Sequence, residues 1–291
     1  MKHENVGAVI VLYNPNLDCL KLSLINLQLQ VCNIILVDNS IDNINTLEFL
    51  NEFDSNLINY IPLNKNTGVA AAQNIGISFF IKKKMDFCLI MDQDSIISDN
   101  MVTQLLGDFL FLKSKNINLA IIGPTPINKE TKKEYSPRIR KNKAFFNEKN
   151  HLIKVSELIS SGSLINIKNL KDIGYMDEKL FIDGVDHEWC WRAINKGYSC
   201  AMSKKAILYH MLGEGDKKIF GIQIAITSSF RVYYQYRNYF YLLKKSYVPI
   251  YWKFNNAIKY FIKFFYYPIF VSPRKLYMKN IIKGIYHGIK Y

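Results

Sequence analysis

The chain lacks the features that mark disulfide-bonded and membrane-spanning proteins. Its five cysteines are widely spaced and form no C-x-x-C pair, which indicates reduced, buried thiols in a cytosolic protein. No stretch reaches the ~18 charge-free apolar residues that a membrane span needs. The most apolar candidate, Ile258 to Val271, contains two lysines and a proline. The first residues lead directly into a strand-like segment, so we expect no secretory signal.

The sequence also lacks the motifs of several familiar enzyme classes. It has no G-x-x-x-x-G-K-[ST] loop, no G-x-G-x-x-G after the first strand-like segment and no G-x-S-x-G nucleophile elbow. His187-Glu188 begins like the zinc-protease motif H-E-x-x-H, but Trp191 stands at its fifth position. These absences disfavour P-loop NTPases, common dinucleotide enzymes and zinc proteases.

Acidic residues are missing from the last quarter of the chain. Residues 217–291 hold 14 Lys and Arg and no Asp or Glu, whereas residues 1–216 hold 24 basic and 24 acidic residues. The same last quarter carries 22 of the 40 aromatic residues. This change of composition predicts a boundary near Asp216. No recognised nucleic-acid motif accompanies the basic tail, and we expect no nucleic-acid partner.

Short apolar runs alternate with helix-like segments before that boundary. This alternation predicts an α/β fold with a mostly parallel sheet flanked by helices, because nearly continuous apolar strands are covered on both faces. The polar stretch Lys129–Lys154 predicts a mobile loop or insertion. The expected strands are Val6–Tyr13, Ile34–Val37, Ile58–Leu63, Phe87–Met91, Leu119–Gly123 and Val155–Ile167, and the expected helices are Leu17–Gln30 and Val69–Lys83.

Two carboxylates leave one of the predicted strands together. Asp92 and Asp94 follow Phe87–Met91 with one residue between them. In open α/β sheets, ligands bind at the carboxyl ends of the strands. Carboxylate oxygens suit Mg²⁺ or Mn²⁺, which usually keep phosphate oxygens among their ligands. The pair therefore indicates a metal site for a nucleotide diphosphate, although a D-x-D pair alone also occurs in ordinary polar turns.

Polar segments follow the predicted elements in a particular order. Each has an ordinary explanation as a turn, a helix cap or a packed polar residue, but their coincidence in this order favours an enzyme. Over roughly residues 6 to 215 the ordered set resembles the family 2 glycosyltransferases of the GT-A fold, and within them the bacterial rhamnosyltransferases that build O-antigen and capsule chains. The segments are Tyr13-Asn14, Asp38-Asn39-Ser40, Asn66-Thr67-Gly68, Asn74, Asp92-Gln93-Asp94-Ser95, Ser160-Ser161-Gly162-Ser163, Phe181 to Arg192, and His210.

The resemblance implies an inverting transferase with a nucleotide-diphospho-sugar donor and Mn²⁺ or Mg²⁺ as cofactor. Residues 1–216 would form the GT-A (Rossmann-like) catalytic domain, with a donor-binding part at about 1–125 and an acceptor part at about 155–216. Asp186 falls at the position of the general base, but Val185 stands where the family usually has Glu, so Asp183 and Glu188 stay open as alternatives. The donor-binding residues would be Tyr13, Asn14, Asp38, Asn66, Gly68, Asn74, Asp92 and Gln93, the metal ligands Asp92, Asp94 and His210, and the acceptor-binding residues Ser161, Gly162 and Trp189.

Transfer with inversion at the anomeric carbon requires two separate groups of carboxylates. A single in-line displacement at the anomeric carbon needs one carboxylate to take the acceptor hydroxyl proton. The leaving diphosphate gains charge as the bond breaks, and a metal ion stabilises that charge. The chain offers Asp92 with Asp94 for the second task and Asp183, Asp186 or Glu188 for the first.

Amphipathic helices that lie at a membrane interface are expected over residues 217–291. Tyr and Trp prefer the membrane–water interface, and Lys and Arg are drawn to anionic lipid. We therefore expect a cytoplasmic protein bound peripherally to the inner face of the cell membrane, where a polyprenyl-diphosphate-linked glycan acceptor is presented. The alternative for these helices is a subdomain that packs its aromatic side chains on the catalytic domain.

The resemblance favours L-rhamnose, carried by dTDP-β-L-rhamnose, as the sugar moved to the lipid-linked oligosaccharide. Alternatives are transfer of another hexose from a UDP-sugar, and a non-catalytic peripheral membrane scaffold of polysaccharide assembly. Sugar nucleotidyltransfer is disfavoured, because no Gly-rich triphosphate loop bearing Lys or Arg follows the first predicted strand.

Overall fold

The apolar runs of the first half form neighbouring parallel strands that are buried on both faces. A computed structural model describes residues 3–128, 132–134, 141–145, 151–210, 216–219 and 222–291. In it β1 (His3–Leu12) pairs in parallel with β2 (Val31–Asp38) and with β4 (Phe87–Asp92), and β3 (Ile58–Pro62) pairs with β2. These predicted strands are confirmed, and their carboxyl ends lie along one edge of the sheet.

The second half of the sheet is mixed. The strand order of the whole sheet is β3-β2-β1-β4-β9-β6-β10-β8-β7. In the second half, β9 is antiparallel to both of its neighbours and β10 is parallel to β6. The expected strand Val155–Ile167 is interrupted, since residues 160–162 form a turn in which Gly162 has φ 77°. Part of Lys129–Lys154, expected as a loop, joins the sheet as strands, and residues 129–131, 135–140 and 146–150 of that stretch lie outside the described residues. The strands are β5 (Ile96–Ile97), β6 (Leu119–Asn128), β7 (Lys141–Phe145), β8 (Leu152–Val155), β9 (Ser163–Asn166) and β10 (Ser199–His210).

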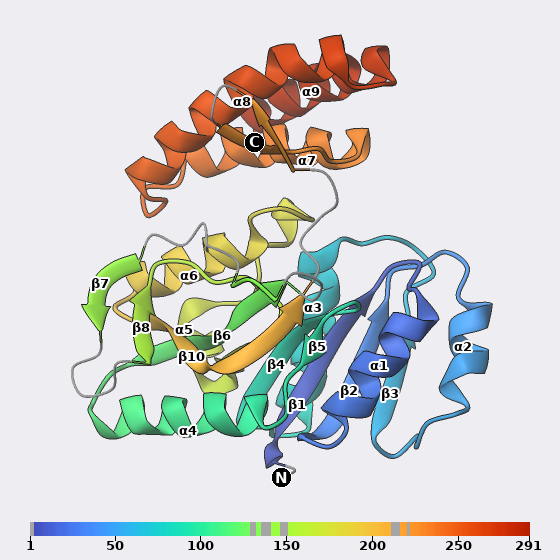
Figure 1. Cartoon of the computed structure of the whole chain (residues 1–291), viewed down its shortest axis with the longest axis vertical. Helices are drawn as coiled ribbons and strands as arrows, with labels where there is room; N and C mark the ends of the chain where they lie inside the picture. The colour runs from blue at the N-terminus through green and yellow to red at the C-terminus, as the bar shows by residue number, and fades with distance from the viewer. Residues whose placement is uncertain (1–2, 129–131, 135–140, 146–150, 211–215, 220–221) are drawn as a thin grey trace.

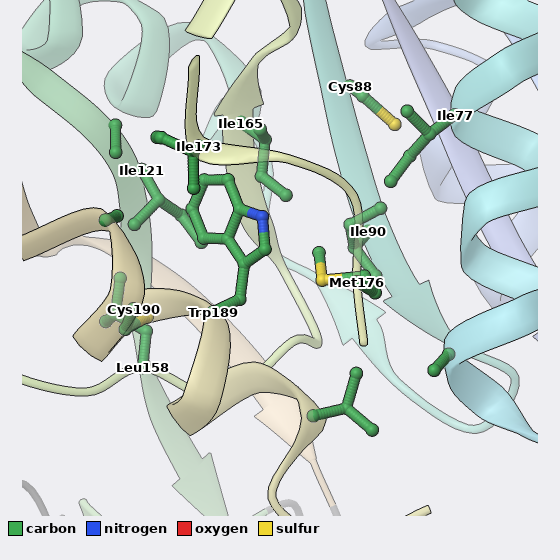
Figure 2. Packing of buried hydrophobic residues seen from close by; sticks show 14 of the residues in the cluster. Ile77, Cys88, Ile90, Ile121, Leu158, Ile165, Ile173, Met176, Trp189 and Cys190 are labelled. Atoms are coloured by element: carbon green, nitrogen blue, oxygen red, sulfur yellow. The ribbon is translucent and has the colours of Figure 1, made fainter. Parts of the chain in front are cut away.

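Helices cover both faces of this sheet (Figure 1). The side chains of α3, α5 and α6 share one buried cluster with the strands, and those of α1, α2 and α4 share the other. In the first cluster the indole of Trp189 lies among Ile121, Ile165 and Ile173 (Figure 2). The helices are α1 (Leu17–Leu27), α2 (Ile44–Leu50), α3 (Val69–Lys82), α4 (Met101–Ser114), α5 (Leu170–Ile173) and α6 (Val185–Asn195).

Three further helices form the C-terminal region, as predicted. A two-stranded hairpin, β11 (Asp216–Ile219) and β12 (Ile222–Ala225), precedes α7 (Ser229–Leu243), α8 (Ile250–Phe270) and α9 (Arg274–Lys290). In Figure 1 these helices lie together on one side of the α/β domain. Within the described ranges, none of the helices combines the length and the apolarity that crossing a bilayer requires.

Candidate active site

The loops that follow β1 and β2 are held by hydrogen bonds within the second loop and between the two loops. The Asp38 carboxylate is fully buried, accepting from the Ser40 N–H at 2.8 Å and from the Tyr60 hydroxyl at 2.7 Å. The Ser40 hydroxyl accepts from the N–H of Asn14, a residue with φ 44°. Burial and the neighbouring Asp38 raise the pKa of Tyr60. Asp38 therefore stabilises this loop from its buried side, and its predicted contact with the nucleotide-sugar donor stays a prediction.

The loop before α3 is built around an Asx turn and a glycine. The Asn66 side chain accepts from the Gly68 N–H at 3.0 Å. Gly68 has φ 88°, and a Cβ at this position would lie 2.6 Å from the Phe181 ring, so no larger residue fits here without a shift of the ring. The Phe181 carbonyl accepts from the Val69 N–H at 2.7 Å, which satisfies one of the free N–H groups of the helix. The donor part is thereby joined to the segment that carries Asp183.

Asn74 also points toward the acceptor part. Its side chain donates to the Met176 carbonyl at 3.0 Å and to Glu178 at 2.8 Å, and it accepts from the Met176 N–H at 2.9 Å. The residue is 7% exposed. Its observed task is to hold residues 176–178 against α3, and a direct contact with the donor stays a prediction.

The Asp-Gln-Asp segment lies where β4 leaves the sheet. Gln93 accepts from the Tyr13 N–H at 2.8 Å and donates to the Tyr13 carbonyl at 3.3 Å, so the ends of β4 and β1 are bound to each other. The Asp92 N–H donates to the Ser161 hydroxyl at 3.2 Å. Asp92 is half-buried and Asp94 is exposed. The two carboxylates are presented at the carboxyl edge of the parallel strands, as predicted from sequence.

His210 is brought to this segment by strand pairing. β10 pairs antiparallel with β5, with Tyr209 opposite Ile96. The same register places His210 next to Ser95, one position from Asp94. The side chain of His210 lies outside the described residues, so its role as a metal ligand stays a prediction.

Residues 179–184 form a loop that the C-terminal helix α7 holds in place. Phe181 and Asp183 have φ values of 63° and 65°, a conformation that L-residues adopt rarely. The Asn238 side chain donates to the carbonyls of Leu180, Ile182 and Asp183 at 2.8, 2.6 and 3.0 Å. Arg237 donates to the Leu180 carbonyl at 2.9 Å. These bonds from buried side chains stabilise a backbone that would otherwise be unfavourable.

Arg231 of α7 forms hydrogen bonds with Asp183 and interacts electrostatically with two further carboxylates. Its guanidinium donates to both oxygens of Asp183, at 2.7 to 3.0 Å. Burial lowers the pKa of Arg231, but the hydrogen bonds and negative charge of Asp183, with the charges of Asp186 and Asp92, raise it above its ordinary value. The Asp92 N–H donates to Ser161 and the N–H of the adjacent Ser160 donates to Asp186, so the end of β4 and the start of α6 are neighbours in space, although about 90 residues separate them.

Asp186 and Glu188 have different surroundings despite standing two residues apart on α6. The half-buried Asp186 carboxylate accepts from the Ser160 N–H at 3.2 Å and from the His187 N–H at 2.9 Å. Glu188 is fully buried, accepts from Arg192 at 2.8 Å on each oxygen and accepts from the Tyr247 hydroxyl at 2.6 Å. Because every oxygen of Glu188 is engaged in the core, the structure favours Asp186 over Glu188 as the residue that meets substrate.

The three predicted acceptor residues lie behind the site. Trp189 is 1% exposed, and its indole N–H donates to the Gly174 carbonyl at 2.9 Å. Ser161 is 1% exposed and donates to the Ser95 hydroxyl at 2.8 Å. A Cβ on Gly162 would lie 2.7 Å from the Pro124 ring. Their positions give no support to a direct acceptor contact; they support the two carboxylate segments from within the core.

The sequence interpretation missed the residues that α7 contributes, chiefly Arg231, Arg237 and Asn238. The segment Arg231 to Asn238 was recognised only as part of a basic, aromatic helix. A signal was present for Glu188, since Arg192 follows it four residues later, the spacing of a helical ion pair.

Comparison with known proteins agrees with this geometry. Residues 8–174 match the protein family described as glycosyl transferase family 2. The chain belongs to glycosyl transferase family 2. The transferase is also 35% identical over 254 residues to the dTDP-rhamnosyl transferase RfbF of Shigella flexneri, an alignment that covers 85% of this chain and 83% of that protein.

Solved structures show that the transferase has the GT-A fold. The crystal structure of GalNAc-T7 with UDP, GalNAc and Mn²⁺ superposes with a TM-score of 0.58 at 16% identity, covering 91% of this chain and 57% of that one. The transferase thus spans little more than half the length of this neighbour. Residues 1–349 of Staphylococcus aureus TarS in complex with UDP-GlcNAc give a TM-score of 0.57 at 15% identity, covering 97% and 81%.

Proposed function

We propose that the transferase moves L-rhamnose from dTDP-β-L-rhamnose, with inversion, to a lipid-linked oligosaccharide in the synthesis of a cell-surface polysaccharide. The observation that carries the reaction is that Asp92 and Asp186 bind the adjacent residues Ser161 and Ser160 at the carboxyl edge of the parallel strands, while Arg231 holds Asp183. The choice of donor is supported by the identity with a dTDP-rhamnosyl transferase.

Asp186 is the proposed general base. It is half-buried, close to Arg231 and held by two backbone N–H groups, which orient the carboxylate at the start of α6. In the reaction it takes the proton of the acceptor hydroxyl as that oxygen attacks the anomeric carbon, and the bond to the diphosphate breaks on the opposite side. Arg231 fixes the Asp183 carboxylate beside this base and is a positioning residue.

Asp92, Asp94 and His210 are the proposed ligands of Mn²⁺ or Mg²⁺. The donor set suits a hard divalent cation, since it offers two carboxylates that reach solvent at the end of β4. A metal ion bound there would stabilise the charge that develops on the departing diphosphate. Tyr13, Asn14, Asp38, Asn66, Gly68, Asn74 and Gln93 remain the proposed donor-site residues, with Asp38 and Asn74 acting through the loops they hold.

The outer face of α8 is the proposed contact with the inner leaflet of the membrane. Six large apolar residues recur along it at intervals of three or four, which places them on one side of a helix. Each is more than half exposed, and residues 217–291 carry no acidic residue that would repel anionic lipid. The six are Ile250, Phe254, Ile258, Phe261, Phe265 and Ile269.

Donor choice is tested by thermal stabilisation. The transferase with Mn²⁺ is heated with dTDP-rhamnose, with dTDP-glucose and with UDP-sugars, and transfer to a lipid-linked acceptor is then measured with each donor. We expect the largest stabilisation and turnover with dTDP-rhamnose, because a ligand that binds the folded chain raises its stability by mass action. Preference for a UDP-hexose would replace the donor assignment, and binding without any transfer would favour a scaffold.

Membrane contact is tested with liposomes that contain anionic lipid. Phe261→Glu puts a charge into the apolar stripe of α8, and we expect it to weaken liposome binding by about tenfold or more. Leu110→Glu is the matched control, because Leu110 is an exposed apolar residue of α4 on the other side of the sheet. Equal binding by the wild type and by Phe261→Glu would contradict the assignment.

A further inference from the structure

A cavity of about 210 Å³ lies between α6 and the C-terminal helices α7 and α8. Asp183, Gly184 and His187 form its wall on the side of the α/β domain. Asp183 also binds Arg231 and stands three residues before Asp186, so this cavity adjoins the segment that carries the proposed base.

The lining combines aromatic rings with side-chain amides. Amides donate and accept hydrogen bonds, as sugar hydroxyl groups do, and aromatic rings offer flat apolar surfaces with polar edges. A few polar groups among aromatic residues are typical of small-molecule sites. The aromatic residues are Tyr239, Tyr251, Trp252 and Tyr260, and the amides are Gln235, Asn255 and Asn256, whereas the Asn238 amide in the same lining is bound to the Asp183 loop.

The formal charges of the lining cancel. Asp183 and Glu157 contribute two carboxylates, and Lys259 and Lys263 contribute two ammonium groups. The carboxylates lie toward α6 and the ammonium groups belong to α8. A lining with balanced charges and many hydrogen-bonding groups suits a neutral ligand rich in hydroxyl groups. A nucleotide diphosphate is better matched to the end of β4 with its proposed metal ion.

We propose that this cavity is the acceptor subsite and binds the pyranose residue whose hydroxyl receives the transferred sugar. The inference rests on the proposed function and deepens it. Asp183 and Gly184 of the cavity wall stand three and two residues before Asp186, and His187 of the same wall follows it directly, so the cavity borders the segment that carries the proposed base. The Glu157 carboxylate, 2% exposed and 3.4 Å from His187, fixes that imidazole in the wall.

The position of α8 connects this subsite with a lipid. One side of the helix supplies Trp252, Asn256 and Lys259 to the cavity, while its outer side carries the exposed apolar stripe. A glycan bound in the cavity therefore has its lipid anchor near the surface that we assign to the membrane. The catalytic domain alone would supply only one wall of the subsite.

The first test measures sugar binding without any transfer. Methyl glycosides of rhamnose, glucose, galactose and N-acetylglucosamine are titrated while tryptophan fluorescence is recorded. Trp252 lines the cavity, whereas Trp189 and Trp191 are 1% and 2% exposed in the core. We expect a saturable change with at least one glycoside and its loss in Asn255→Phe, which fills the cavity mouth from an exposed helix position. Asn45→Phe, on exposed α2, is the matched control and should bind like the wild type.

The second test separates this inference from the proposed function. With an acceptor that the wild type uses, Asn255→Phe should raise the acceptor KM by about tenfold or more and leave the donor KM within about twofold. An unchanged acceptor KM, or a titration in which Asn255→Phe binds glycosides like the wild type, would overturn the subsite. If the wild type transfers no sugar from any nucleotide donor, the proposed function fails, and the glycoside titration still decides whether the cavity binds a pyranose.

Discussion

The donor half and the acceptor half of the transferase are held together in different ways. In the donor half, the loops at the strand ends are fixed by their own neighbours: Asp38 binds the N–H of Ser40, and Asn66 binds that of Gly68. In the acceptor half, the loop that carries Asp183 is fixed by Asn238, 55 residues further along the chain.

This difference shows that the C-terminal helices hold the loop that carries Asp183 in place and are packed against the α/β domain. Three tyrosine hydroxyls of this region bind carboxylates of the α/β domain: Tyr241 binds Asp177, Tyr247 binds Glu188, and Tyr251 binds Glu157. The tail therefore packs its inner side on the α/β domain, as one of the two alternatives predicts; α8 also leaves an apolar stripe exposed, and membrane contact stays a prediction.

Asp186→Asn should give the largest effect. Removal of the proposed base from the acceptor half lowers kcat by about 10³-fold, and the free energy of unfolding changes by less than about 1 kcal/mol because the residue is half-buried. Steady-state kinetics and denaturant unfolding measure the two quantities. Asp172→Asn, at an exposed carboxylate of α5, is the control. If Asp186→Asn turned over like the wild type, Asp186 would not be the general base.

Glu188→Gln should destabilise the chain without removing the chemistry. The change breaks a buried ion pair with Arg192, so the free energy of unfolding falls by about 3 kcal/mol. The folded variant keeps most of its turnover. A loss of kcat as large as that of Asp186→Asn, at unchanged stability, would instead identify Glu188 as the base.

Asn238→Ala compares long-range with local support. It removes the side-chain donor of the Ile182 and Asp183 carbonyls and one of the donors of the Leu180 carbonyl, which keeps Arg237, and we expect a loss of about 2 kcal/mol in the free energy of unfolding, together with a lower kcat/KM for the acceptor. Asn66→Ala removes one local bond of the donor half and should cost less than about 1 kcal/mol. Equal losses in the free energy of unfolding of the two variants would contradict the difference between long-range support in the acceptor half and local support in the donor half.

Tyr251→Phe should lower the free energy of unfolding below pH ~10, and this difference from the wild type should shrink as the pH rises. Burial and the hydrogen bond to Glu157 raise the pKa of Tyr251 to about 12, above the unfolded value of about 10. The folded chain holds this proton more tightly, so the contribution is complete below pH ~10 and is lost as the pH rises toward ~12. Unfolding free energies over this range should fall less steeply for Tyr251→Phe than for the wild type. Tyr175→Phe, at a 42% exposed position, is the control.

The strands and the donor loops could be predicted because their signals are local. Continuous aliphatic runs mark β1, β2 and β4, and Asn66-Thr67-Gly68 has the turn chemistry that its Asx bond and positive φ require. The order of these segments was enough to indicate the family, which the comparisons confirm.

The arrangement of the acceptor half could not be predicted, because its partners are distant in sequence. Nothing near Asp183 indicates that Arg231, 48 residues later, binds its carboxylate. Asp186 and Glu188 differ in burial only because a helix turns one toward the edge of the sheet and the other into the core. Trp189 stands four residues after the buried Val185, a helical core spacing that opposed its assignment to the acceptor.

The contribution of α7 to the active site is tested most directly by the turnover of Arg231→Gln at saturating donor and acceptor. Arg231 binds Asp183, which stands three residues before the proposed base Asp186, so we predict a fall in kcat of about 10²-fold. Arg274→Gln, at an exposed arginine of α9, should turn over like the wild type. A kcat for Arg231→Gln within about twofold of that of Arg274→Gln would contradict the claim that the C-terminal helices complete the catalytic site.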